Sequence, residues 1–201
     1  MALVVTLLLM AVALLVLPPD DEPPAARPTA TAEVPTAPTA DKRLAPGDPP
    51  DRLVVPAISL DAPLVPIEVK QDGSLDPPSD TDIVGWWQRS AHPGQMPGQT
   101  VITGHTVHTG GGVMNELGDL QRGEEVEVHD DGRVVTYRVT EVFVYTREEV
   151  AANAQGLFGQ DRPGGRLVLV TCTDWNGSSY DSNIIVYGEP LAIEKETAPA
   201  G

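Results

Sequence analysis

The chain has 201 residues, which allows one ordinary domain with appendages. It carries 29 acidic and 13 basic residues, for a formal net charge of −16. This balance argues against nucleic-acid binding, which needs clustered lysines and arginines. The acidic residues are scattered, which favours an acid-biased proteome over attraction of a cationic substrate or a divalent cation.

The N-terminal segment, residues 1–17, contains no charged side chain. Its length is at the low end for a membrane-spanning helix, which needs about 17–25 apolar residues. The segment lacks the basic start and the clear small-residue cleavage site of a signal peptide. We therefore expect an uncleaved single-pass membrane anchor with its N-terminus inside. A cleaved signal segment and a buried helix of a soluble domain are the alternatives.

A proline-rich segment follows the apolar run. Residues 18–52 hold half of the 20 prolines, with Ala, Thr and acids between them. Because proline removes backbone donors and keeps the chain extended, and little here can be buried, we predict a disordered spacer. The tail, residues 194–201, is expected to be flexible. This leaves residues 53–193 as the predicted folded domain.

The signals within this domain are mostly those of β-structure. Two alternating runs flank Asp131-Gly132, a pair favoured in tight turns, and together they predict a hairpin. Residues 100–105 read as a short buried strand, and residues 166–172 read as a strand buried on both faces. Short strands joined by Gly and Pro turns, with little helix, are typical of a β-barrel or a β-sandwich.

Helical signals are few. Thr146 and Glu149 have the spacing of a capping box, which predicts a helix start at Arg147. Residues 113–120 could form one or two further helical turns. A mainly β fold with one or two short helices is therefore expected.

Cys172 is the only cysteine in the chain. It has no partner for an internal disulfide, so it is an accident, an intermolecular link or a reactive thiol. It lies where a predicted buried strand gives way to a polar loop, and this position combines a rigid backbone with access to a groove. A nucleophile needs both properties, and its thiolate needs a base nearby.

Four histidines could serve as that base: His92, His105, His108 and His129. His105 ends a predicted apolar strand, and Gly104 before it allows close backbone approach, so its placement matches that of Cys172. His108 lies in the following Gly-rich loop and is a weaker candidate. His92 and His129 read as surface residues, the latter in a solvated turn with Asp130. A Cys–His pair from two strand ends can support acyl transfer.

Two stretches of the chain resemble the sortase family, in particular its actinobacterial class E and F members. They are GWWQRSAHPGQMPGQTVITGHT and RLVLVTCTDWNGSSYDSNIIVYGEP, with the Gly-rich loop between them. The strand motif Leu169-Val170-Thr171-Cys172 is similar to a variant of the family's T-x-T-C pattern. The resemblance covers nearly all of residues 53–190, and the anchor and spacer fit it.

The resemblance implies a closed eight-stranded sortase β-barrel and a cysteine transpeptidase. Its substrates would be proteins with an LPxTG-like sorting signal, cleaved between Thr and Gly. Cys172 would be the nucleophile that carries the acyl group as a thioester, and His105 the general acid and base. A cell-wall precursor or pilin amine would accept the acyl group. The enzyme would sit in the cell membrane through its N-terminal segment, with the catalytic domain outside.

The sequence departs from the family at the start of the last strand, where sortases usually carry an Arg. Asn183 stands at that position by one alignment and Asp181 by another. Asp181 would repel an oxyanion and is rejected. Asn183 can donate a neutral hydrogen bond, but a charge-assisted one is roughly twice as strong. Either Asn183 and backbone amides suffice, or the enzyme is slow, or another arginine reaches in. The arginine candidates are Arg89, Arg147 and Arg166.

Other expectations concern the groove and possible ligands. Thr171 and Trp175 flank Cys172 and are candidate substrate-binding residues, although Trp175 could equally be a packing residue. No spacing of Cys, His, Asp or Glu reads as a metal site, and no cofactor is expected. Because the Arg is missing, a catalytically impaired sortase-fold peptide-binding module is the main alternative. An adhesin in which Cys172 is buried and inert is a third possibility.

Overall fold

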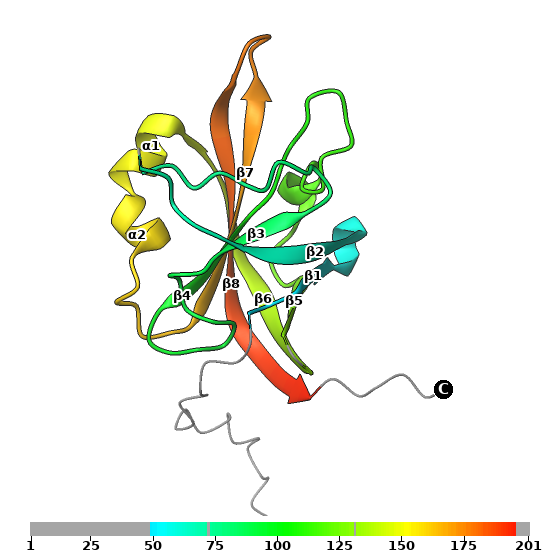
Figure 1. Ribbon diagram of the computed structural model, residues 1–201, viewed down its shortest axis with the longest axis vertical. Coiled ribbons are helices and arrows are strands. Elements are labelled where there is room, and N and C mark those ends of the chain that lie inside the picture. Colours follow the sequence, from blue (N-terminus) through cyan, green and yellow to red (C-terminus); the bar gives the residue numbers. More distant parts are fainter. Residues whose placement is uncertain (1–48, 72, 131, 196–201) are drawn as a thin grey trace, which may run out of the picture. The chain divides into compact units, whose positions relative to one another are not determined.

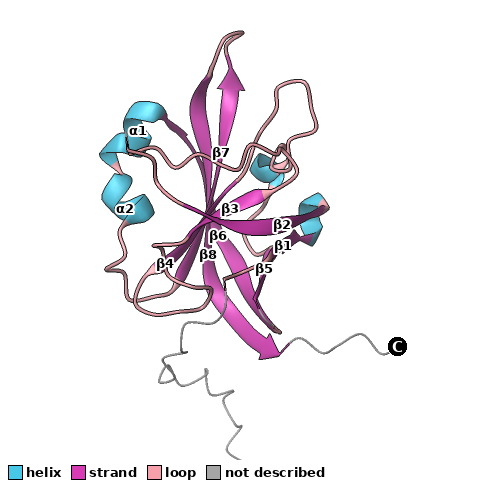
Figure 2. Ribbon diagram, viewed as in Figure 1, coloured by secondary structure: helices cyan, strands magenta, loops and turns pink. Residues whose placement is uncertain are grey.

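The fold is a closed β-barrel with short helices on its outside (Figures 1 and 2). The computed structural model describes residues 49–71, 73–130 and 132–195. Its eight strands follow each other around the barrel in the order β1-β2-β3-β4-β7-β8-β6-β5. The predicted mainly β fold, with eight strands and two short α-helices, is confirmed. The predicted anchor, nearly all of the predicted spacer and most of the predicted tail lie outside the described residues.

The strands differ greatly in length. In chain order they are β1 (Arg52–Val55), β2 (Leu60–Ile67), β3 (Val84–Trp87), β4 (Gln99–Thr103), β5 (Glu125–Asp130), β6 (Arg133–Thr146), β7 (Arg166–Trp175) and β8 (Tyr180–Lys195). The helical segments are two 3₁₀ turns, Pro56–Ile58 and Leu117–Asp119, and the α-helices α1 (Arg147–Ala152) and α2 (Ala154–Phe158). Among the described residues, no helix has the length and apolar character needed to cross a bilayer.

Strand β7 lies between β4 and β8 in the barrel. β4 and β7 are parallel, with Thr103 opposite Val170, so both strands run toward the same edge of the barrel. β7 and β8 are antiparallel, with Cys172 opposite Asn183. β4 ends at this edge with Thr103, while β7 continues past it to Trp175 alongside the start of β8.

The apolar run of β7 is buried on both faces, as its sequence predicts. Leu167 and Leu169 face the core inside the barrel, while Val168 belongs to a second apolar cluster on the outside. Leu157 of α2 is fully buried in this outer cluster. The continuous apolar pattern of the strand thus reflects a helix that covers its outer face.

Two local predictions are confirmed. β5 and β6 form the antiparallel hairpin expected around Gly132, which has a positive φ of 78°. Helix α1 begins at Arg147 with the capping box in place: the Thr146 hydroxyl accepts from the Glu149 amide at 3.2 Å, and the Glu149 carboxylate accepts from the Thr146 amide at 2.8 Å.

The expectation that His129 lies on the surface is wrong, and His92 is only partly exposed. His129 belongs to β5 and is only 8% exposed, because its strand pairs with β1 on one side and β6 on the other. Asp130 is also buried, and it binds Arg133 at 2.6 Å instead of sitting in a solvated turn. His92 packs against Trp86 with ring centroids 4.8 Å apart, and burial lowers the pKa of His92.

Candidate active site

Cys172 lies on β7 near the edge of the barrel where β4 ends, two residues beyond Val170 and three residues before the end of β7. Its thiol is half-buried, and the amide of Asn183 on β8 donates to Sγ at 3.8 Å. The same amide donates to the backbone oxygen of Thr171 at 3.3 Å. β8 pairs with β7 at Cys172 itself, and β4 pairs with β7 up to Val170, so the sulfur is mounted on the backbone of a paired strand.

His105 follows directly on the end of β4, the strand next to β7. The Gly104 amide donates to the Val170 oxygen at 3.3 Å, which extends the β4–β7 pairing to within one residue of His105 and two of Cys172. Glycine is favoured at position 104, because a Cβ would meet the Met114 side chain at 2.9 Å and that side chain would have to shift. His105 thus stands at the end of its strand, as predicted, whereas Cys172 does not: β7 continues three residues past it to Trp175, because β8 pairs with it over that length.

The His105 ring is oriented by a backbone carbonyl. Its Nε2 lies 2.7 Å from the oxygen of Pro78, in the segment between β2 and β3. A carbonyl oxygen only accepts, so Nε2 carries the proton, and in the neutral ring Nδ1 holds the lone pair. Nε2 is therefore used to orient the ring, and Nδ1 is available as a base.

The Thr171 side chain on β7 forms hydrogen bonds with the residues that follow β4. Its buried hydroxyl donates to the Gly104 oxygen at 2.8 Å and lies 2.8 Å from the hydroxyl of Thr106. Since the hydroxyl has one proton, it accepts from Thr106. Thr171 lines the pocket described next, but its hydroxyl is bound to these neighbours.

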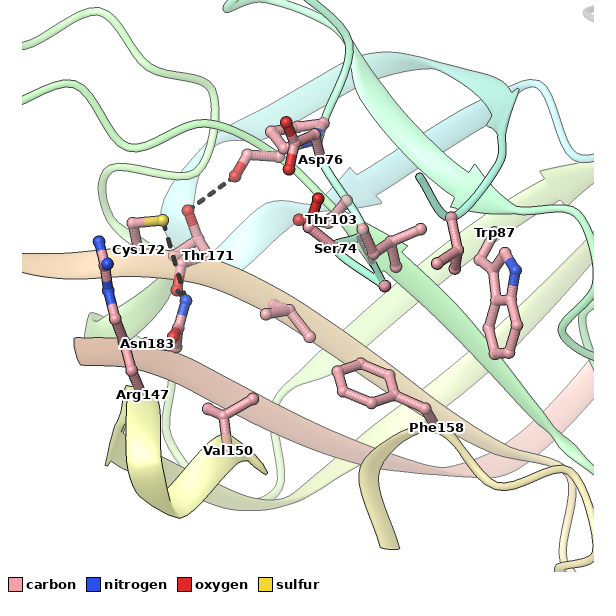
Figure 3. Close-up of a pocket in the computed structure, with 16 residues that line it drawn as sticks. Ser74, Asp76, Trp87, Thr103, Arg147, Val150, Phe158, Thr171, Cys172 and Asn183 are labelled. Carbon is pink, nitrogen blue, oxygen red and sulfur yellow. Dashed lines mark hydrogen bonds between the residues drawn. The ribbon is translucent and has the colours of Figure 1, made fainter. Parts of the chain in front are cut away.

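The thiol opens into a pocket of about 550 Å³ (Figure 3). Strands β4 and β7 contribute Thr103 and Val170, and helix α1 contributes Arg147 and Val150. The segment between β2 and β3 lines the pocket from Gly73 to Pro77. Its apolar walls are made by Val69, Leu75, Trp87, Val150, Phe158 and Val170.

Burial and two charges act on the Cys172 thiol. Burial raises the pKa of Cys172 above the ordinary thiol value, because it disfavours the anion. The charge of Arg147 lowers this pKa, and the charge of Asp76 raises it. The resting thiol is therefore predominantly protonated at neutral pH and needs a base to form the thiolate.

Two of the three candidate arginines are used elsewhere. Arg166 is buried: it donates to the Gln99 side chain at 2.6 and 3.0 Å and to the Gly156 oxygen at 2.6 Å, and its guanidinium lies 3.8 Å from the Tyr187 ring centroid. Arg89 forms an ion pair with Glu68 at 3.1 Å. Arg147 is the arginine that lines the pocket together with Cys172.

Trp175, the second candidate substrate-binding residue, contacts aromatic rings instead of the pocket. Its ring stacks on His108, with centroids 4.2 Å apart and an angle of 5°, and it leans on Tyr180 at 5.0 Å. It does not belong to the described residues that line the pocket. The contacts favour the packing interpretation of Trp175, and its role in substrate binding stays a prediction.

The approach of Asp76 to the thiol was missed at the level of sequence. The sequence predicts only a turn at residues 71–74 in this region, and the signal that could have drawn attention to Asp76 is an acidic residue between Leu75 and two prolines. Asp76 forms an ion pair with Lys70. Within the described residues, no group of three or more His, Cys, Asp or Glu side chains is arranged to hold a metal ion.

A family model for the sortase domain matches residues 53–191. The chain therefore belongs to the sortase family, whose members are cysteine transpeptidases. A search of curated proteins found no significant match. The class E or F assignment stays a prediction.

Solved structures agree with this fold. Sortase C-1 from Actinomyces oris is 23% identical with a TM-score of 0.55, covering 74% of this chain and 76% of that one. Sortase A from Listeria monocytogenes is 16% identical with a TM-score of 0.56, covering 73% and 90%. Sortase A from Corynebacterium diphtheriae is 18% identical with a TM-score of 0.55, covering 77% and 64%.

Proposed function

We propose that this chain is a cell-surface transpeptidase that cleaves an LPxTG-like sorting signal between Thr and Gly and transfers the protein to a cell-wall or pilin amine. The single observation that carries the proposal is the Cys172 thiol at the mouth of an apolar pocket, on the strand next to His105. The apolar walls suit the Leu and Pro side chains of such a signal.

The reaction has two halves. His105 takes the thiol proton, and Sγ forms a bond to the Thr carbonyl carbon while the carbonyl electrons move to its oxygen. When this intermediate collapses, the C–N bond breaks, the amine of Gly leaves with the proton from His105, and a thioester remains on Cys172. An incoming amine then forms a new C–N bond, returns its proton through His105 and releases the thiol.

The orientation of His105 supports this role. Its Nε2 proton is held by the Pro78 oxygen, so the other ring nitrogen is the one that can exchange a proton with sulfur or amine. The half-buried thiol fits a nucleophile that is protonated at rest and activated by a base. We further propose that residues 1–17 anchor the chain in the membrane, with the domain outside.

The proposal is tested by a peptide-library cleavage assay on the full chain, read by mass spectrometry. We expect a library peptide of the LPxTG type to leave an acyl adduct on Cys172 and to be released by an added amine. Cys172→Ala and His105→Ala should each abolish cleavage, while circular dichroism shows an unchanged fold. Normal turnover by Cys172→Ala would overturn the proposal.

A second function is favoured by one observation, the neutral Asn183 opposite Cys172 on β8. A sortase-fold module that binds sorting peptides without cleaving them would give peptide binding and no adduct on Cys172. The same mass-spectrometry experiment therefore separates the two candidates.

A further inference from the structure

The start of β8 carries no cation beside the nucleophile in the described part of the chain. Asn183 stands opposite Cys172 and offers only a neutral amide. Asp181 is exposed and accepts from the Asn176 side chain at 2.7 Å, in the hairpin between β7 and β8. An oxyanion formed at Cys172 would therefore find no positive charge on β8 itself.

The neighbouring strand brings an arginine to the same place. β6 pairs with β8 so that Tyr145 is opposite Asn183 and Thr146 is opposite Ser182. Arg147 is the next residue, and the capping box fixes its backbone as the first residue of α1. Figure 3 shows its guanidinium directed toward Cys172, and Arg147, Cys172 and Asn183 line one pocket.

Arg147 is available in a way that the other candidate arginines are not. None of the hydrogen bonds and ion pairs among the described residues engages its guanidinium, and the side chain is exposed. Arg166 is bound to Gln99 and Gly156, and Arg89 is paired with Glu68. A cation at the first position of a helix also gains nothing from the helix dipole, which favours acidic residues there. The placement of Arg147 is thus not explained by the stability of α1.

We propose that the Arg147 guanidinium, together with the Asn183 amide, binds the carbonyl oxygen of the scissile bond and stabilises the oxyanion. This inference rests on the proposed transpeptidase function. When Sγ bonds to the carbonyl carbon, the negative charge moves to the oxygen, and the guanidinium donates to it. When the C–N or C–S bond breaks, the electrons return to the carbonyl. The positive charge that sortases usually carry on the last strand is here supplied from β6–α1.

The first test compares Arg147→Gln with wild type in the full chain, with a library-selected peptide as substrate. Removal of one oxyanion donor commonly costs about 10²–10³ in kcat, so we expect acylation of Cys172 to slow by that factor with little change in KM. Arg138→Gln is the matched control, because Arg138 is an exposed arginine of β6 away from the pocket, and it should keep wild-type rates. Arg147→Lys keeps the charge without the planar fork and should lie between.

Arg147 also lowers the pKa of Cys172, so thiolate formation needs a separate readout. The rate of alkylation by iodoacetamide measures the thiolate alone. If Arg147 acted only on the thiol, alkylation and acylation would fall by the same factor and higher pH would restore both. That result would overturn the oxyanion role. We expect acylation to fall far more than alkylation, and the deficit to persist at high pH.

Relocation of the charge is the sharpest test. The double variant Arg147→Gln, Asn183→Arg places the guanidinium on β8 opposite Cys172, and it should recover much of the acylation rate that Arg147→Gln loses. A double variant no faster than Arg147→Gln would contradict the proposal. If the acylation rate of Arg147→Gln stayed within about threefold of the wild-type rate, the role of Arg147 would be overturned, but not the transpeptidase function. Absence of any Cys172 adduct in the wild type would overturn the transpeptidase function as well.

Discussion

At the scale of single residues, the reactivity of Cys172 depends on charges that come from distant parts of the chain. Burial raises the pKa of the thiol, Arg147 opposes this effect, and Asp76 adds to it. Because the thiolate is the nucleophile, its population at a given pH follows directly from this balance. The alkylation rate of Cys172 should therefore rise with pH through the neutral range.

Asp76→Asn removes the charge that raises the pKa of Cys172. The pKa of the thiol should fall, so a larger fraction is ionised at neutral pH and alkylation by iodoacetamide should be faster than in wild type. The pH dependence of the alkylation rate measures this shift directly. Asp82→Asn, an exposed residue of the same segment, is the control. An unchanged or higher midpoint in Asp76→Asn would contradict the electrostatic account.

At the scale of elements, the site depends on how β4 and β7 are held together. β4 and β7 are parallel neighbours, and their hydrogen-bond ladder is prolonged by the Thr171 hydroxyl, which binds Gly104 next to His105. This contact is buried, so water cannot replace it. The relative position of His105 and Cys172 therefore depends on a side chain whose hydroxyl is bound to its neighbours.

Thr171→Val removes this hydroxyl and keeps the shape of the side chain. The Gly104 oxygen and the Thr106 hydroxyl both lose a partner, and we expect a loss of about 1–3 kcal/mol in the free energy of unfolding, measured by urea denaturation. kcat should also fall, since small displacements of catalytic groups are costly. Thr171→Ser should retain most of both properties. Thr173→Val, two residues along β7, serves as the control for substitution on this strand.

At the scale of the whole molecule, the barrel buries a polar group within its core. Tyr137 of β6 is completely buried, and its hydroxyl accepts from the Gly94 amide at 2.7 Å and lies 3.4 Å from the Thr100 hydroxyl. Burial raises the pKa of Tyr137 to about 12. The folded barrel thus binds this proton more tightly than the unfolded chain, in which tyrosine titrates near 10.

This difference predicts a loss of stability in alkali. Below pH 10 the contribution of Tyr137 is fully present, and it is lost as pH rises from 10 to 12, by up to about 3 kcal/mol, because the unfolded state gives up the proton first. Urea unfolding measured from pH 8 upward should show the decline, and Tyr137→Phe should flatten it. Tyr145→Phe is the matched control. A decline equally steep in Tyr137→Phe would assign the effect to other groups.

Prediction from sequence succeeded where the signal is local. The capping box of Thr146 and Glu149, the hairpin at Gly132 and the doubly buried strand β7 depend on neighbouring residues, and all are confirmed. The surface interpretation of His129 was wrong, because its burial depends on pairing with β1, some 75 residues away in the sequence. The same limit applied to Asp76, whose approach to Cys172 comes from a long segment without regular structure.

The sequence by itself determined the family, the barrel and the position of His105 at a strand end, because motifs and apolar patterns are carried by contiguous residues. Only the tertiary structure decided which arginine faces the thiol. The sequence does not distinguish Arg89, Arg147 and Arg166, which differ in their surroundings in the folded barrel. Arg89 lies beside the carboxylate of Glu68, and Arg166 belongs to a buried hydrogen-bond network. Arg147 lines the open pocket. Long-range pairing of β6 with β8 sets that difference, since it places Arg147 one residue beyond the pair formed by Thr146 and Ser182.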